Sequence, residues 1–316
     1  MEITFLGTSS GVPTRSRNVS SLALRLPQRA EVWLFDCGEG TQHQLLRSEV
    51  KISQISRIFI THLHGDHIFG LMGLLASCGL AGAGQGLELY GPPGLAEYLQ
   101  ACAQWSATHL MHRIRVHTIT AEGVLYEDED FQVRCGLLKH RIPAYGYRVQ
   151  ERDRPGRFRV EQAQALGIPA GPLYGQLKAG KVVTLANGKR ICGQDLCDPP
   201  VAGRSLAYCT DTVFCEGAIA LAQKADVLIH EATFAHQDAE LAFERLHSTS
   251  TMAAQVAHLA QVKQLIMTHF SPRYAPGNAL QLEDLLAEAR AIFPQTLMAK
   301  DFFTYSIPRS STETSA

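Results

Sequence analysis

The strongest constraint on this chain is a dense group of metal-binding side chains directly after a β-forming segment. The group spans six residues and consists of His62, His64, Asp66 and His67. Core packing does not explain three imidazoles and a carboxylate in so short a stretch, because histidine and aspartate are rarely buried without partners. Side chains two residues apart in an extended segment point the same way, so His62 and His64 predict two ligands of one ion.

The same motif predicts a second ion beside the first. Gly65 permits a tight turn, after which Asp66 and His67 project from the start of an apolar helix that begins near Ile68. Nitrogen and oxygen ligands of this kind suit zinc, with manganese and iron as competitors. One loop cannot complete two sites, so further ligands must come from elsewhere in the chain.

Three later polar residues each follow an apolar strand. His140 comes after the strand predicted at 131–138, Asp211 after the one at 205–209, and His269 after the one at 264–267. Asp211 is able to bridge two ions through its two oxygens. One predicted ligand set is therefore His62, His64, His140 and Asp211, and the other is Asp66, His67, Asp211 and His269.

Length and composition limit the class of protein. The chain has 316 residues, of which 46% are hydrophobic and 19% charged, so it is not disordered throughout. No apolar run reaches the ~18 residues of a membrane span, and the first residues lack the features of a signal peptide. Eight cysteines without a Cys-x-x-Cys pair indicate reduced thiols in a cytosolic protein.

The order of predicted elements favours an α/β fold. Each half of the chain reads as strands followed by helices, which suits two stacked sheets with helices outside, a four-layer αββα sandwich. The segments 114–120, 124–126, 131–138 and 145–149 are expected to form sequential antiparallel strands. We expect one domain over residues 1–307 and a polar tail over 308–316.

A segment of different composition interrupts this domain. Residues from about 150 to 200 are rich in Pro and Gly, and nine basic against three acidic residues between Arg148 and Arg190 give this stretch a charge of +6. Because the whole chain carries −1, the remainder carries −7. We interpret the segment, called the arm below, as an insertion that projects from the core, with a basic surface suited to phosphate contact.

The motifs together resemble the metallo-β-lactamase superfamily and, more narrowly, the short form of its RNase Z family of tRNA 3′-processing endonucleases. The His62–His67 motif with His140, Asp211 and His269 carries the first resemblance. The narrower one rests on Pro13-Thr14-Arg15-Ser16-Arg17-Asn18, Phe35-Asp36-Cys37-Gly38-Glu39, His230-Glu231-Ala232-Thr233, His247-Ser248-Thr249 and the Gly171-Pro172 region of the arm. In the first of these motifs Arg15 replaces the family's Lys. The Gly-Pro part of the arm matches the family pattern less closely than the other motifs do. The resemblance covers residues 1–307.

The resemblance implies a zinc-dependent endoribonuclease with two Zn²⁺ per subunit. Such an enzyme removes the 3′ trailer from precursor tRNA after the discriminator nucleotide, leaving a 3′-OH on the tRNA and a 5′-phosphate on the trailer. A hydroxide between the metals would be the nucleophile, oriented by Asp66. His247 would protonate the departing oxygen, with Glu231 orienting it. The alternative is that His247 is an ordinary histidine at a helix start, next to the capping residues Ser248, Thr249 and Ser250. The resemblance also implies a cytoplasmic homodimer.

Two regions are expected to contact RNA. Arg15, Arg17 and Asn18 lie in a Pro-containing loop and would hold phosphate or position the tRNA end. The arm would grip tRNA through Gly171 and Pro172, while Lys178 and Lys181 contact its backbone. Asp36 is suited either to hold a metal-bound histidine or to form a turn.

Two other functions fit parts of the sequence. A small-molecule phosphodiesterase, lactonase or thioesterase of the same fold would share the metal ligands but would need neither the basic arm nor the Arg-Asn loop. A metal-free partner subunit would have lost ligands, whereas all seven are present. The arm therefore favours an RNA substrate.

Overall fold

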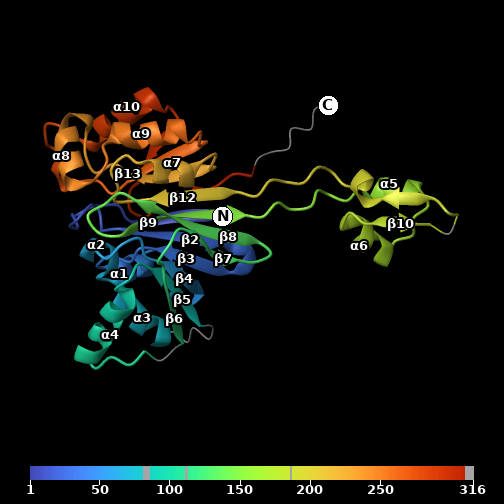
Figure 1. Ribbon diagram of the computed structural model, residues 1–316, viewed down its shortest axis with the longest axis horizontal. Coiled ribbons are helices and arrows are strands. Elements are labelled where there is room, and N and C mark those ends of the chain that lie inside the picture. The colour runs from blue at the N-terminus through green and yellow to red at the C-terminus, as the bar shows by residue number, and fades with distance from the viewer. Residues whose placement is uncertain (81–85, 111–112, 186, 310–316) are drawn as a thin grey trace. The chain divides into compact units, whose positions relative to one another are not determined.

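The computed structural model describes residues 1–80, 86–110, 113–185 and 187–309. Within these residues the strands form two seven-stranded sheets and one two-stranded sheet (Figure 1). Short 3-10 turns connect some of the elements and lie at Pro27–Arg29, Ile52–Gln54, Gly193–Leu196, His236–Asp238 and Pro272–Tyr274. No helix in the described ranges is both long and apolar enough to cross a membrane.

The first sheet is formed mainly by the N-terminal part of the chain. Its strands, in spatial order, are β16 (Thr304–Ser306), β1 (Glu2–Gly7), β2 (Ser21–Leu26), β3 (Glu31–Phe35), β4 (Ile55–Phe59), β5 (Leu87–Gly91) and β6 (Ile114–Thr118). The strands from β3 to β6 pair in parallel, whereas β1 pairs antiparallel with both β2 and β16. The associated helices are α1 (Thr41–Leu46), α2 (Gly65–Ile68), α3 (Leu71–Leu80) and α4 (Leu95–Trp105).

The second sheet is formed mainly by the C-terminal half. Its strands, in spatial order, are β15 (Thr296–Met298), β14 (Gln264–Thr268), β13 (Val227–Glu231), β12 (Ser205–Cys209), β9 (Ala144–Glu151), β8 (Phe131–Leu138) and β7 (Gly123–Glu127). The run from β12 to β15 is parallel. Its helices are α7 (Glu216–Ala222), α8 (Ala239–Arg245), α9 (Ser250–Leu259) and α10 (Leu282–Ile292).

One strand expectation is wrong. The segment that begins at Ile114 does not pair antiparallel with its successor, but extends the first sheet by pairing in parallel with β5. The chain then crosses to the second sheet, where β7 pairs antiparallel with β8. A five-residue strand shows its burial pattern but not its partner, so the sequence alone does not locate this crossing between sheets.

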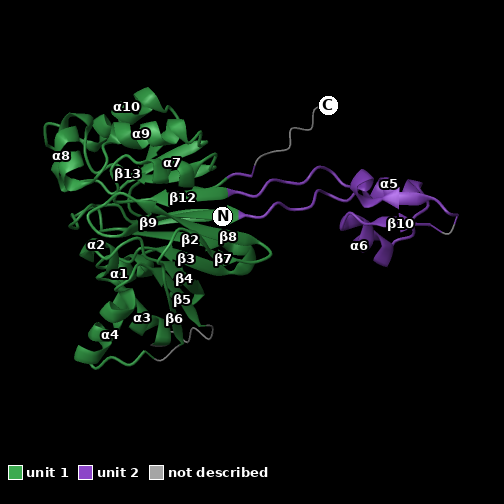
Figure 2. Ribbon diagram, viewed as in Figure 1, with its two compact units in different colours: residues 1–150, 205–307 green, residues 151–204, 308–316 purple. Residues whose placement is uncertain are grey.

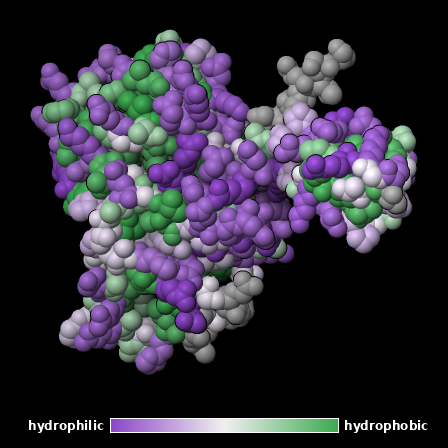
Figure 3. All heavy atoms as spheres, turned by 45° about the vertical axis from the view of Figure 1, so that its right-hand side comes forward, coloured by the Kyte–Doolittle hydropathy of each residue, from purple (hydrophilic) through white to green (hydrophobic). Residues whose placement is uncertain are grey.

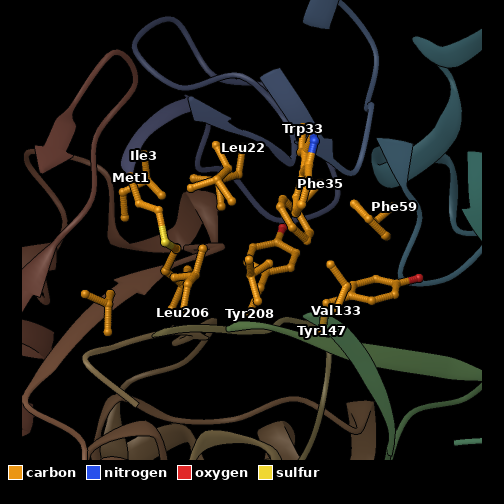
Figure 4. Close-up of a cluster of buried hydrophobic side chains, with 14 of the residues drawn as sticks. Met1, Ile3, Leu22, Trp33, Phe35, Phe59, Val133, Tyr147, Leu206 and Tyr208 are labelled. Carbon is orange, nitrogen blue, oxygen red and sulfur yellow. The ribbon is translucent and has the colours of Figure 1, made fainter. Parts of the chain in front are cut away.

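The two sheets pack face to face around an aromatic core. Phe35 and Phe59 of the first sheet contact Tyr147 of the second, with ring centroids 5.9 and 5.4 Å apart (Figure 4). Separate buried clusters lie on the outer faces: Leu71, Leu74 and Leu99 with the first sheet, and helices α7, α9 and α10 with the second. The expected four-layer αββα sandwich is thus confirmed, because each sheet buries both faces.

The segment between β15 and β16 holds the loop between β1 and β2 in place. The Asp301 carboxylate accepts hydrogen bonds from Thr8 Oγ1 (2.7 Å), the Asn18 amide (2.6 Å) and Gln44 Nε2 (2.8 Å). Phe303 stacks on Phe5 with centroids 6.1 Å apart. The loop between β1 and β2 is therefore fixed by residues almost 300 positions later in the chain.

The chain divides into two compact units (Figure 2). The first comprises residues 1–150 and 205–307; the second comprises 151–204 and 308–316 and contains the predicted arm. On the face drawn in the space-filling view, hydrophilic side chains predominate and apolar ones form smaller groups (Figure 3). The polar tail predicted at 308–316 lies mostly outside the described residues.

The second unit has a small apolar core of its own. Its elements are α5 (Val160–Ala165), α6 (Pro172–Lys178), β10 (Val182–Thr184) and β11 (Arg190–Cys192). Leu177, Ile168 and Ile191 are buried together, and Tyr174 packs against this group. Pro172 begins α6, where its missing N–H costs no hydrogen bond.

Candidate metal centre

Five structural elements meet at one cluster of polar side chains. The turn after β4 carries His62 and His64, and α2 carries Asp66 and His67. The remaining three predicted ligands, His140, Asp211 and His269, follow β8, β12 and β14. Because parallel strands end at the same edge of a sheet, segments far apart in the sequence meet here.

The first predicted ligand set converges. Nδ1 of His64 lies 3.0 Å from Nε2 of His62 and 3.1 Å from Nε2 of His140. Oδ2 of Asp211 lies 3.6 Å from Nε2 of His62 and 3.9 Å from Nε2 of His140. All four ligand atoms lie within 4.8 Å of one another.

The second set is equally close. Nε2 of His67 lies 3.2 Å from Oδ1 of Asp211 and 3.5 Å from Oδ2 of Asp66. Nε2 of His269 lies 3.2 Å from the same Asp211 atom and 3.4 Å from the same Asp66 atom. Tetrahedral ligands at about 2.0–2.1 Å from zinc are about 3.3 Å apart, so this donor set fits such an ion. Nε2 of His67 is buried and has no hydrogen-bond partner among the described residues, as a metal ligand requires.

Hydrogen bonds fix which nitrogen each histidine turns toward the cluster. Nδ1 of His140 donates to the Leu246 carbonyl at 2.9 Å, and Nδ1 of His269 donates to Thr233 Oγ1 at 2.9 Å. Nδ1 of His62 lies 3.0 Å from Thr61 Oγ1. Each of these bonds leaves an unprotonated Nε2 facing the other ligands, which is the arrangement found around metal-bound histidines.

Asp36 holds both the first turn and His67. Its Oδ2 accepts from Nδ1 of His67 at 2.9 Å, and its Oδ1 accepts from the Thr61 amide at 2.8 Å. Asp36 also has φ of 58°, so it does form a turn, and both roles proposed for it are realised. Gly38 lets this turn approach α2, since a Cβ there would lie 2.3 Å from the Asp66 carbonyl oxygen.

Two predicted ligands have an unusual backbone. Asp211 has φ of 51° and His269 has φ of 59°, both in the left-handed region that costs a non-glycine residue about 1 kcal/mol or more. Each occurs just after a buried strand, where the turn reverses the chain and aims the side chain across the strand ends. Such conformations concentrate at functional sites.

The site favours positive charge. Burial raises the pKa of Asp211, but the neighbouring His269, His67 and His62 outweigh burial and hold it well below the usual range. Burial lowers the pKa of His67, but the carboxylates of Asp211, Asp66 and Asp36 outweigh it and raise this pKa well above the usual value. Carboxylates that stabilise a buried imidazolium also stabilise a bound cation at the same place.

His247 and Glu231 lie beside the predicted ligands. Nδ1 of His247 donates to Oε1 of Glu231 at 2.9 Å, and the Glu231 side chain is fully buried. Burial opposes protonation of His247, but the Glu231 carboxylate raises its pKa to about 9. Cations bound nearby would lower the pKa of His247. Thr249 caps α9 by accepting from the Met252 amide, so one of the three expected capping residues does form the cap beside His247.

Two cavities border the cluster, and His64 lines both of them. One, of about 400 Å³, is lined by His64, His140 and His247 together with Arg141, Arg245 and Arg273. The other, of about 390 Å³, is lined by His64 and Asp66 together with Gly11, Val12 and Phe69. Sequence reasoning did not select these arginines or Phe69, because they lie among ordinary surface residues. The geometry offers a cation-binding centre with a proton donor and two adjoining cavities.

Comparisons with known proteins agree with this geometry. Residues 1–140 match the family model described as Anti-Pycsar protein Apyc1, and residues 200–270 match the beta-lactamase superfamily domain. The chain is 77% identical over 313 residues to the Ribonuclease Z of a Synechocystis species, covering 99% of this chain and 96% of that protein. It is 75% identical to the Ribonuclease Z of Crocosphaera subtropica, covering 99% and 100%. The chain belongs to the ribonuclease Z family.

A solved structure of the ribonuclease Z family supports the same conclusion. The human tRNase Z short form is 33% identical, with a TM-score of 0.71, and the match covers 98% of this chain and 100% of that one. The expected family and the metallo-β-lactamase fold are confirmed, as is the expectation that the chain is an enzyme. Its His and Asp clusters make it a metal-binding enzyme.

In this ribonuclease Z family member, two of the three residues predicted to contact RNA in the N-terminal loop form hydrogen bonds within the protein. The Arg17 guanidinium donates to Thr8 Oγ1 at 2.7 Å and to the Ala299 carbonyl at 2.8 Å. Asn18 Nδ2 donates to the Glu39 carbonyl at 2.7 Å. Arg15 is exposed and has no hydrogen bond or ion pair with any described residue. Arg15 is thus the member of this loop that is free to meet a phosphate.

The four arm residues predicted to contact RNA lie on the surface of the second unit. Gly171 and Pro172 begin α6 and are exposed, as are Lys178 at its end and Lys181 beyond it. Among the residues that sequence reasoning missed, Thr233 has the clearest signal. It closes the His230-Glu231-Ala232-Thr233 motif, and its hydroxyl lies between Glu231 and His269.

Proposed function

We propose that this enzyme is an endoribonuclease that removes the 3′ trailer from precursor tRNA. The cut falls after the discriminator nucleotide and leaves a tRNA 3′-OH and a trailer 5′-phosphate. The observation that carries this proposal is the pair of ligand sets joined by Asp211, beside the Glu231–His247 pair, in a chain 77% identical to a Ribonuclease Z.

The metal component of the proposal is two Zn²⁺ per subunit. His62, His64, His140 and Asp211 would hold one ion, and Asp66, His67, Asp211 and His269 the other. Imidazole and carboxylate donors at these separations suit zinc. Ions bound there would lower the pKa of water and stabilise negative charge on the phosphate.

The protein's own groups would manage the protons and the orientation. The oxygen of water forms a bond to phosphorus while the bond from phosphorus to the ribose O3′ breaks. Asp66, held ionised by His67 and His269, orients the attacking water and takes up the proton that the water loses. His247, protonated on both nitrogens while Glu231 accepts from Nδ1, gives the Nε2 proton to O3′.

The arm and the loop would select tRNA over smaller phosphodiesters. Lys178 and Lys181 are exposed on the second unit and supply positive charge that meets the RNA backbone. Gly171 and Pro172 are exposed at the start of α6, where backbone closely approaches a partner without side-chain obstruction. In the N-terminal loop Arg15 would contact phosphate, and Arg17 and Asn18 would position the loop near the cut.

The proposed assembly is a homodimer in which the arm of one subunit serves the tRNA whose end enters the other subunit's centre. Because precursor tRNA is an intracellular molecule, the proposal places the enzyme in the cytoplasm. The mass of the enzyme in solution, measured by light scattering, tests the dimer separately from the activity.

The activity is tested by incubating the enzyme with a precursor tRNA that carries a labelled trailer. We expect one cut, after the discriminator nucleotide, and a large loss of cutting with Asp66→Ala. Scattered cuts, or none, would contradict the tRNA assignment. A small dye phosphodiester is the control: cleavage of the dye without cleavage of tRNA would instead favour a small-molecule phosphodiesterase.

A further inference from the structure

An exposed aromatic ring lies at the entrance to the metal centre and has no role in the mechanism above. Phe69 follows α2 directly, and 64% of its surface is exposed. It lines the cavity of about 390 Å³ that also contains His64 and Asp66. A large apolar ring left in water beside a catalytic centre calls for a partner that covers it during function.

The ring is held in one position. A Cβ built on Gly65 would lie 2.2 Å from Cε2 and 2.4 Å from Cζ of Phe69, so the ring lies directly against the glycine backbone. The Phe69 amide donates to the Gly65 carbonyl at 2.9 Å, which fixes the backbone that carries the ring. Gly65 thus supports one side of the ring, and the other side faces the cavity. A pre-oriented ring binds a flat partner at low entropic cost.

The two cavities share His64, but one contains His247 whereas the other contains Asp66 and Phe69. The cavity of about 400 Å³ is lined by His247, which gives its proton to the departing O3′. The ribose that carries O3′ belongs to the discriminator nucleotide, so that nucleotide must lie on the His247 side. The nucleotide on the other side of the phosphate is the first nucleotide of the trailer, and the cavity that remains for it is the one with Phe69.

We propose that Phe69 stacks on the base of the first trailer nucleotide and thereby holds the scissile phosphate over the metal centre. This inference rests on the proposed function. Besides Phe69 and the predicted ligands His64 and Asp66, the cavity is lined by apolar side chains such as Val12 and by Glu39, whose carboxylate accepts but does not donate hydrogen bonds. Stacking is tolerant of sequence because every base has a flat face. The subsite therefore accepts any trailer base, and it favours purines because their faces are larger.

The test removes the two stacking partners separately and together. Wild type and Phe69→Ala are compared on a precursor with an ordinary first trailer nucleotide and on one with an abasic nucleotide there. Base–aromatic stacking corresponds to about 5- to 150-fold in kcat/KM, so each single change is expected to cost a factor in that range. The double change costs no more than either single change, and Phe69→Trp restores cutting of the ordinary precursor.

Two controls match these changes. Trp105→Ala removes an aromatic side chain that is 85% exposed at the end of α4, and it leaves cutting unchanged. An abasic discriminator nucleotide lowers cutting by the same factor in wild type and in Phe69→Ala. A second readout does not depend on cutting: 5-iodouridine at the first trailer position, irradiated in the complex, crosslinks to Phe69.

The outcomes separate this inference from the proposed function. Losses that multiply in the double change, or a crosslink that maps to Phe234 in the cavity with His247, overturn the base subsite. Conversion of a dimer to a monomer by Phe69→Ala also overturns it, because the ring then covers a second copy of the chain. If wild type cuts no precursor tRNA, the proposed function fails, and the crosslink alone decides whether Phe69 contacts the trailer.

Discussion

Oε1 of Glu231 lies 2.9 Å from Nδ1 of His247, and the same carboxylate accepts hydrogen bonds from the Thr212 and Ser248 amides. Three groups are thus joined by one fully buried side chain. This arrangement orients the imidazole and keeps it protonated without any contact between Glu231 and the cavity. Glu231 is therefore a positioning residue, and His247 is the group that reaches the substrate.

Replacing His247 by Ala is expected to lower kcat about 10²- to 10⁴-fold with little change in KM, since it removes the proton donor. A precursor whose O3′ at the cleavage site is replaced by sulfur distinguishes this role from a structural one. A departing thiolate needs no proton, so the variant cuts that substrate nearly as fast as wild type does. An equal loss on both substrates would show that His247 acts in some other way.

Replacing Glu231 by Gln is expected to move the alkaline limit of activity to lower pH. Glu231 raises the pKa of His247, and the proton donor works only below that pKa. Removing the negative charge lowers the pKa, so kcat falls at a lower pH than in wild type. Measured pH profiles of kcat test this, and Glu88→Gln, which alters a carboxylate that pairs with Arg115 and His117, leaves the limit unchanged.

The convergence of the seven predicted ligands was predictable because their residue types cluster, or follow apolar strands, in a way that packing does not explain. The groups that hold those ligands were less predictable. Thr61 contacts His62, but an isolated threonine carries no such pattern. Thr233, which contacts His269, is marked only as the last residue of a motif. The left-handed backbone of Asp211 and His269 depends on how the turns pack, which a local sequence does not specify.

The sequence patterns also did not predict the helices of the arm or the division of one apolar helix into two. The arm is rich in Pro and Gly, and its residues show no helical period, yet α5 and α6 form because Leu177 and Ile168 share a small core. The apolar helix expected from Ile68 is instead divided into α2 and α3. Contacts distant in sequence decide both outcomes.

Replacing Asp36 by Asn is expected to weaken metal binding about 10- to 100-fold, because an amide holds Nδ1 of His67 less firmly than a carboxylate. Metal content after dialysis against a dilute chelator measures the effect. The exposed Asp130 provides the control, since Asp130→Asn lies outside the ligand network. Equal metal retention by both variants would contradict the role assigned to Asp36.

Removing the metals with EDTA is expected to abolish cutting and to lower the melting temperature. Ions present at 1,000 times their dissociation constant stabilise the folded state by about 4 kcal/mol. For a unit of this size that corresponds to a fall of about 10 °C. Calorimetry with and without EDTA measures it, and added Zn²⁺ restores both properties. An unchanged melting temperature would mean that the cluster holds no ion.

Replacing residues 153–202 by an Asn-Gly turn is expected to abolish cutting of precursor tRNA while retaining hydrolysis of a dye phosphodiester. The Glu151 amide donates to the Arg204 carbonyl at 2.8 Å, so the ends of the segment are adjacent and a short turn joins them. A milder variant, Lys178→Ala with Lys181→Ala, lowers the salt dependence of tRNA binding. Lys51→Ala is its control. Full tRNA cutting by the shortened chain would remove the arm from substrate selection.

The anchoring of the N-terminal loop by Asp301 has a consequence for synthesis on the ribosome. That loop carries Gly11, whose amide donates to Asp66 at 2.8 Å, and its anchor is translated near the end of the chain. Similarly, one edge of β1 stays unpaired until β16 has been translated. A nascent chain therefore completes its catalytic centre only after nearly all of it has been made, and a chain that stops early carries the ligands without the means to align them.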